Sequence, residues 1–125
     1  MYSSILQLFL VGIVWGVTNP FIKLATNKVK RRNKKFDLVS QVTDHLNNRN
    51  YLIPFAINQC GSLLFYFTLK NSDISLAVPI ANGMSFVSTS IVGPLLGEEK
   101  PKFRTLLGIL FLLFGIFCFV IDKKL

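Results

Sequence analysis

The sequence predicts an all-α membrane protein in which four transmembrane helices form a single domain over residues 1–125. Three observations indicate this class. Hydrophobic residues make up 51% of the chain, which is more apolar surface than a soluble domain of 125 residues can bury. The chain nevertheless carries 14 Lys and Arg against 6 Asp and Glu, a net charge of +8. These charges are separated from the apolar residues along the chain, as in the loops and spans of a membrane protein.

Four stretches without any charged residue define the spans, namely residues 1–22, 51–69, 74–97 and 105–121. Each is close to the roughly 17–25 residues with which a helix crosses about 30 Å of hydrocarbon. A soluble helical bundle would instead place charges on the outer face of each helix. Short connections join the last three spans, so we expect neighbouring spans there to form antiparallel hairpins. The predicted transmembrane helices cover about residues 5–22, 51–69, 74–96 and 105–121.

The first predicted helix combines glycines with polar residues near its end. Gly12 and Gly16 are four residues apart, so they share a helix face and let a second backbone approach closely. Pro20 lacks a backbone donor, which bends the helix and leaves the carbonyl near Gly16 without its usual partner. Trp15 and Asn19 fall on or beside the same stripe. We interpret this face as one that packs against protein.

The loop predicted over residues 23–50 is strongly basic, and its charges have two interpretations. They set the topology of the chain, or they also contact anionic lipid headgroups, where each cation near the surface adds about 1 kcal/mol. A nucleic-acid site would need a soluble domain around it, so we expect no nucleic-acid partner. The cations that would contact lipid are Lys28, Lys30, Arg31, Arg32, Lys34 and Lys35.

Apolar residues at helical spacing follow this basic run. Phe36, Val39, Val42 and Leu46 alternate with polar residues, which predicts a short amphipathic helix in the headgroup region. The single histidine, His45, stands on the polar side, where we expect a solvated surface residue.

The distribution of Lys and Arg predicts how the chain is inserted. One side of the membrane would hold both termini and the 70–73 turn, with 3 cations in all. The other side would hold residues 23–50 and 97–104, with 11 cations. Short loops rich in Lys and Arg stay in the cytoplasm. We therefore predict a cytoplasmic 23–50 loop and non-cytoplasmic termini.

Polar residues interrupt the second helix and small residues the third. Asn58 and Gln59 lie at the middle of the second helix, where an amide facing lipid costs several kcal/mol, so we expect them to point into the bundle. In the third helix, small residues recur every fourth position and permit close packing and interhelical hydrogen bonds. This series is Ala77, Ala81, Ser85, Thr89, Gly93 and Gly97.

The fourth predicted helix is nearly all Leu, Ile and Phe. Gly108 and Gly115 stand one heptad apart within it. We expect a helix that faces lipid or a partner and makes one close contact.

The polar positions inside the predicted helices allow two interpretations. They form hydrogen bonds that hold helices together, or they line a polar cleft for a small solute or lipid. The residues of such a cleft would be Trp15, Asn19, Asn58, Gln59, Asn82, Ser85 and Thr89. The residues expected at close helix contacts are Gly12, Gly16, Ala81, Gly93, Gly108 and Gly115.

The sequence shows no combination of residues that is typical of a catalytic site. The predicted spans contain no Asp, Glu, Arg or His, so this chain alone cannot build a proton-coupled antiporter on a buried carboxylate. We find no nucleophile–base pair, phosphate loop or metal-ligand cluster. We therefore expect no enzyme activity, no cofactor and no metal.

Two sets of motifs resemble known families. Val14–Lys23, with Trp-Gly-x-x-Asn-Pro-Phe inside it, resembles the opening helix of the drug/metabolite transporter superfamily, and Leu96–Glu98 with Gly108-x6-Gly115 resembles the end of one of its repeats. More closely, the chain is similar to the transmembrane protein 234 family, a group of small four-span eukaryotic membrane proteins. That similarity rests on Tyr51–Phe55, Asn58–Leu64, Leu76–Ile80 and Ile91–Gly93.

The resemblance implies a fold like one drug/metabolite transporter repeat and a relation to small-solute transport, with no assigned substrate residues. Such transporters bind between two repeats, so moving a solute or lipid would need a homodimer or a second membrane protein. The alternative is a non-transporting interaction or scaffold protein that packs against a partner through small-residue helix faces. The resemblance also implies that Glu98 fixes a helix end or loop.

Overall fold

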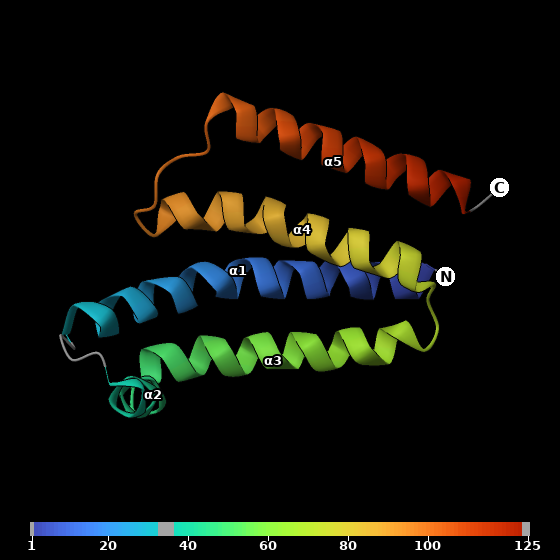
Figure 1. The fold of residues 1–125 in the computed structure, drawn as a ribbon. Coiled ribbons are helices and arrows are strands. Elements are labelled where there is room, and N and C mark those ends of the chain that lie inside the picture. Colours follow the sequence, from blue (N-terminus) through green and yellow to red (C-terminus); the bar gives the residue numbers. More distant parts are fainter. Residues whose placement is uncertain (1, 33–36, 124–125) are drawn as a thin grey trace.

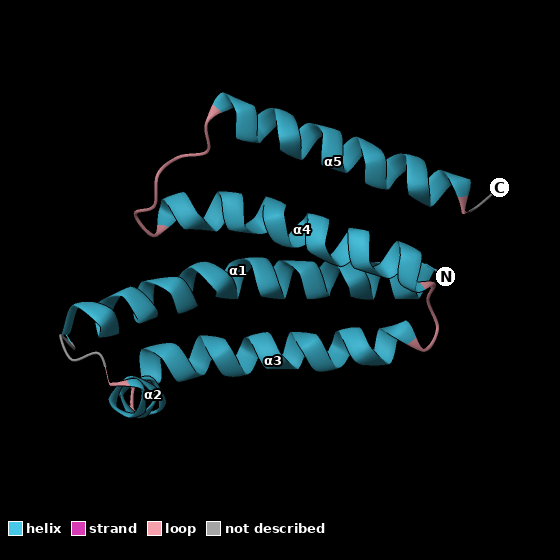
Figure 2. Cartoon of the chain, viewed as in Figure 1, coloured by secondary structure: helices cyan, strands magenta, loops and turns pink. Residues whose placement is uncertain are grey.

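The computed structural model describes residues 2–32 and 37–123, and five helices occupy most of these two ranges (Figures 1 and 2). Four of these helices are long and apolar enough to cross a membrane, which confirms the all-helical, four-span class. A short fifth helix precedes the second span. The helices are α1 (Tyr2–Arg32), α2 (Leu38–Leu46), α3 (Arg49–Leu69), α4 (Ile74–Leu95) and α5 (Phe103–Asp122).

The four long helices lie in one row in the order α3, α1, α4, α5 (Figure 1). Helix α1 packs against both α3 and α4, whereas α5 packs against α4. The chain direction makes α1 parallel to α4 and antiparallel to α3. The short turn after α3 does reverse the chain as expected, but α1 lies between the two helices that this turn connects. The N-terminal helix is therefore the centre of the bundle.

Helix α1 is longer than the sequence analysis expected. Its predicted end was residue 22, but the helix continues to Arg32, so the first ten residues of the predicted loop are helical. The cations after residue 22 limit how far this segment enters hydrocarbon, but they do not end the helix. Lys and Arg are good helix formers, and they stabilise the last turn of a helix, where they stand here. A helix of 31 residues is about 46 Å long, which exceeds the roughly 30 Å hydrocarbon layer.

Helix α2 occupies the place where the apolar spacing predicted a short amphipathic helix. The Asp37 carboxylate caps it by accepting a hydrogen bond of 3.3 Å from the Val39 amide. Its apolar residues, including Val42 and Leu46, are exposed. Figure 1 shows α2 end-on and the long helices side-on, so α2 lies across the end of the bundle. Phe36, like Lys34 and Lys35, lies outside the described residues.

The buried core lies toward the end of the bundle that holds the N-terminus. Leu8 of α1 packs there with Leu76, Ala77 and Ile80 of α4. At the same end, an ion pair of 3.0 Å joins Lys123 to Asp73. Helix α5 contributes no buried residue. The row of helices therefore leaves most of its large apolar side chains exposed, as expected where lipid is the solvent.

Candidate functional site

Helices α1 and α4 meet backbone to backbone at two glycines. A Cβ atom added to Gly12 would stand 2.6 Å from the Ala81 carbonyl oxygen. One added to Gly16 would stand 2.5 Å from the Ser85 carbonyl oxygen. Both distances are far below van der Waals contact, so only glycine fits at either position. The small-residue face of α4 is thus the surface that α1 occupies.

At this interface, a backbone carbonyl of α1 that Pro20 leaves without its helical donor accepts a hydrogen bond from α4. Pro20 has no N–H, so the carbonyl of Gly16, four residues earlier, lacks its helical donor. The Thr89 hydroxyl donates to that carbonyl over 3.1 Å. Thr89 therefore acts as a hydrogen-bond link between α4 and α1.

Helices α1 and α3 are joined by a polar cluster. The Asn58 amide donates to the Thr18 hydroxyl over 2.7 Å and to the Asn19 side-chain oxygen over 3.2 Å. The Thr18 hydroxyl donates in turn to the Val14 carbonyl over 2.7 Å. Sequence reasoning missed Thr18, which is buried. Thr18 stands four residues after Val14 and next to Asn19, and this position in the sequence could have indicated that it belongs to the polar cluster.

Trp15 packs beside this cluster. Its ring centroid lies 5.3 Å from that of Phe65, and its indole edge would be 3.1 Å from a Cβ atom added to Gly61. The indole nitrogen is buried and has no hydrogen-bond partner among the described residues. The contact of Trp15 with α3 is therefore a packing contact.

The seven residues predicted to line a polar cleft do not surround one cavity in the described structure. Trp15, Asn19 and Asn58 lie where α1 meets α3, whereas Ser85 and Thr89 lie where α4 meets α1. Two others lie elsewhere. Gln59 is exposed on α3, and Asn82 is exposed beside a cavity of about 360 Å³ between α4 and α5. The expectation that Gln59 points into the bundle is wrong, because α3 packs only one face, the one that carries Asn58, Gly61 and Phe65.

The remaining predicted packing residues have different surroundings. Ala81 is fully buried. Gly93 lies against the Glu98 carboxylate, 2.8 Å from the position of an added Cβ atom, so it makes room for its own following loop. Added Cβ atoms at Gly108 and Gly115 would meet no described atom within 4 Å. These two glycines mark no close contact inside the described chain.

Glu98 anchors the loop that follows α4. Its backbone N–H donates to the Gly93 carbonyl over 3.0 Å and Gly97 has a positive φ of 94°, the geometry of a helix C-terminal turn built on glycine. Its carboxylate forms an ion pair of 2.9 Å with Lys23 of α1. The Lys23 side chain is 63% exposed, as expected for a cation at the membrane surface.

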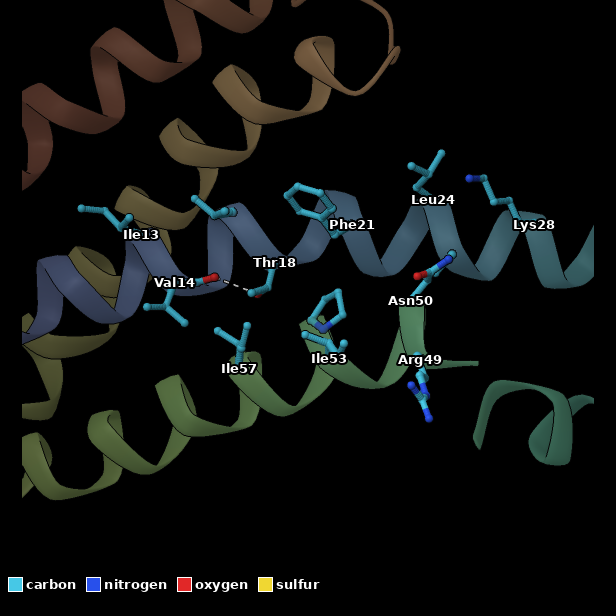
Figure 3. Close-up of a pocket in the computed structure, with 13 residues that line it drawn as sticks. Ile13, Val14, Thr18, Phe21, Leu24, Lys28, Arg49, Asn50, Ile53 and Ile57 are labelled. Carbon is cyan, nitrogen blue, oxygen red and sulfur yellow. Dashed lines mark hydrogen bonds between the residues drawn. The ribbon is translucent and has the colours of Figure 1, made fainter. Parts of the chain in front are cut away.

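The α1–α3 groove is a cavity of about 600 Å³ between these two helices (Figure 3). Its walls are mostly apolar, and Figure 3 shows Lys28 of α1 and Arg49 and Asn50 of α3 at one end of it, with the Lys28 and Arg49 side chains pointing away from each other. None of the seven predicted cleft residues lines this groove. Its lining consists of Ile13, Val14, Val17, Thr18, Phe21, Leu24, Ala25, Lys28, Arg49, Asn50, Ile53, Pro54 and Ile57.

Comparison with known proteins identifies the family. The sequence model described as "Putative transmembrane family 234" matches residues 8–120. A transmembrane protein 234 homolog of Dictyostelium discoideum is 41% identical over 123 residues, which covers 96% of each chain. A homolog of the same name from Anopheles gambiae is 37% identical over 125 residues, covering 98% of this chain and 89% of the relative. No solved structure matches the chain. The chain is therefore a multi-pass membrane protein of the transmembrane protein 234 family.

Proposed function

We propose that this protein binds a lipid, or a comparable amphiphile of the bilayer, in the α1–α3 groove. The observation that carries the proposal is the composition of the groove, whose long apolar walls end in two cations. An amphiphile has the same division between an apolar body and a polar end. The proposed role is a non-enzymatic one.

Access to the groove is lateral. Ile13, Phe21 and Leu24 on α1 are each about two-fifths exposed, and Ile53 and Ile57 on α3 are 60% and 48% exposed. In a membrane these side chains face hydrocarbon, so a lipid chain reaches the groove without crossing water. The volume of about 600 Å³ is within the range of protein sites for small molecules.

Binding in the groove is favoured over passage of a solute between the helices. The interior amide and hydroxyl groups of Asn58, Thr18 and Thr89 are engaged in hydrogen bonds between or within helices. Groups occupied in this way stabilise the bundle and leave few donors for a polar substrate. Transport by a complete two-repeat assembly would need a partner chain.

The test compares two isoleucines of equal exposure. Ile53 lies in the groove and is 60% exposed, whereas Ile91 lies on α4, outside the groove, and is 61% exposed. We expect Ile53→Trp to fill the groove and reduce the phospholipid retained by the purified protein, measured by native mass spectrometry. Ile91→Trp is the matched control and should retain the wild-type amount. Equal retention by both variants would refute the proposal.

A second candidate function is the interaction role, and the surroundings of α5 favour it. Helix α5 has no buried residue, and the exposed Asn82 amide stands beside it within the span of α4. A polar group at that depth is stabilised by a hydrogen-bonding partner. We expect a second copy or another membrane protein to co-purify in mild detergent and to be lost on Gly115→Leu. Ala56→Leu, at an exposed position of α3, serves as the control.

A further inference from the structure

We infer that the ligand of the α1–α3 groove is an anionic phospholipid whose headgroup occupies a polar hollow at the basic end of α1. This inference rests on the proposed function and names the class of its ligand. The hollow has a volume of about 640 Å³ and adjoins the groove, because Lys28 and Asn50 line both. The other residues around the hollow are Val29, Arg32, Asp44, Asn47 and Asn48.

The two cavities together have the shape and polarity of one phospholipid in a single leaflet. The apolar wall from Ile13 to Leu24 extends over about 16 Å of helix, which is close to half of the roughly 30 Å hydrocarbon layer. Lys28 and Arg32 follow about 6 and 12 Å farther along α1, at the depth of the headgroups. The chain of a lipid would therefore lie in the groove while its phosphate reaches the hollow.

The cations of the hollow and of the adjoining end of the groove favour a negatively charged ligand. Lys28, Arg32 and Arg49 are exposed, and none belongs to the ion pairs found among the described residues, which join Lys23 to Glu98 and Lys123 to Asp73. Asp44 also lines the hollow and is engaged in an interaction of its own. Lys28 and Arg32 thus line the hollow together with one carboxylate, and Arg49 lines the adjoining end of the groove. Arg and Lys are the side chains that bind phosphate best.

Helix α2 places the hollow at the membrane surface. It packs against both α1 and α3 and contributes Asp44 to the lining of the hollow, and Asn47 follows it directly. Its exposed Leu38, Val39 and Val42 suit insertion among headgroups, because an amphipathic helix lies in the plane of the interface. A zwitterionic headgroup would bring its own cation into this basic site. An anionic headgroup is therefore the complementary one.

The experiment measures headgroup preference at constant acyl chains. Wild-type protein is reconstituted in nanodiscs that contain equal amounts of phosphatidylglycerol and phosphatidylcholine with identical chains, and the bound lipid is quantified by native mass spectrometry. The test variant is Lys28→Gln with Arg32→Gln, the two cations that line the hollow. The matched control is Lys102→Gln with Arg104→Gln, which removes an exposed Lys and Arg at the start of α5, outside both cavities. Lys28→Arg keeps the charge and should keep the preference.

We expect the test variant to lose about 30-fold in its preference for phosphatidylglycerol, the equivalent of about 1 kcal/mol for each of two cations. The control should change it little. An equal loss in both double variants would mean general surface attraction and would overturn the inference.

The Ile53→Trp variant separates this inference from the proposed function. If it releases both lipids while the Lys28 and Arg32 double variant keeps the full preference, the groove binds lipid but the headgroup assignment is wrong. If Ile53→Trp releases neither lipid, the groove is not the binding site and both proposals fail.

Discussion

Replacing Gly16 by alanine tests whether backbone contact between α1 and α4 holds the bundle together. The new Cβ atom would lie 2.5 Å from the Ser85 carbonyl oxygen, whereas such atoms are comfortable near 3.5 Å. The two helices must therefore move apart by about 1 Å. Overpacking of this kind typically costs about 1–3 kcal/mol. The separation also weakens the 3.1 Å hydrogen bond from Thr89, and such bonds in membranes average about 0.6 kcal/mol.

The matched control is Gly115→Ala, because its added Cβ atom meets no described atom within 4 Å. Both substitutions gain the same helix propensity of about 1 kcal/mol, so this contribution cancels between them. We expect Gly16→Ala to be less stable than Gly115→Ala by about 1–3.5 kcal/mol in free energy of unfolding. Reversible unfolding by SDS in mixed micelles, followed by circular dichroism, measures the difference. Two variants of equal stability would show that the helices are not in contact at Gly16.

Three further predictions concern hydrogen bonds and insertion. Thr89→Val should lower the free energy of unfolding by about 0.6–1.7 kcal/mol, because the Gly16 carbonyl loses its donor, whereas Thr89→Ser should restore it. Asn58→Leu removes two hydrogen bonds to α1 and should loosen α3. We expect amide hydrogen exchange to increase over the wild-type rate more in α3 than in α4, and an equal increase in both helices would contradict this. In a cysteine-free background, a cysteine at Asn27 should react with impermeant reagents only from the cytoplasm and one at Asn71 only from the opposite side. The reverse labelling would contradict the charge-based topology.

Local chemistry in the sequence was sufficient for several features of the site. Pro20 alone indicates that the carbonyl near Gly16 needs a partner, and the structure supplies Thr89. The spacing of Gly12 and Gly16 indicates a close helix contact, and α4 provides it. In each case the cause lies within about one helical turn, so the sequence shows it directly.

Other features depended on packing that no local pattern reports. Gln59 is adjacent to Asn58 in the sequence, yet only Asn58 reaches α1, because successive residues point about 100° apart around a helix. Gly108 and Gly115 have the spacing of a contact face, but a Cβ atom added at either position would meet no described atom within 4 Å. The end of α1 was placed too early, because the cations at residues 23–32 limit membrane insertion without ending a helix.

The sequence by itself determined the class of this protein, because the separation of charge from apolar residues depends only on the order of amino acids. It likewise determined the four spans, the short helix before the second span and the family. Only the tertiary structure decided that α1 lies between α3 and α4 and that the α1–α3 groove ends at Lys28 and Arg49. The reason is physical: Lys28 and Arg49 are 21 positions apart, and they lie at the same end of the groove because two helices of the bundle run antiparallel side by side.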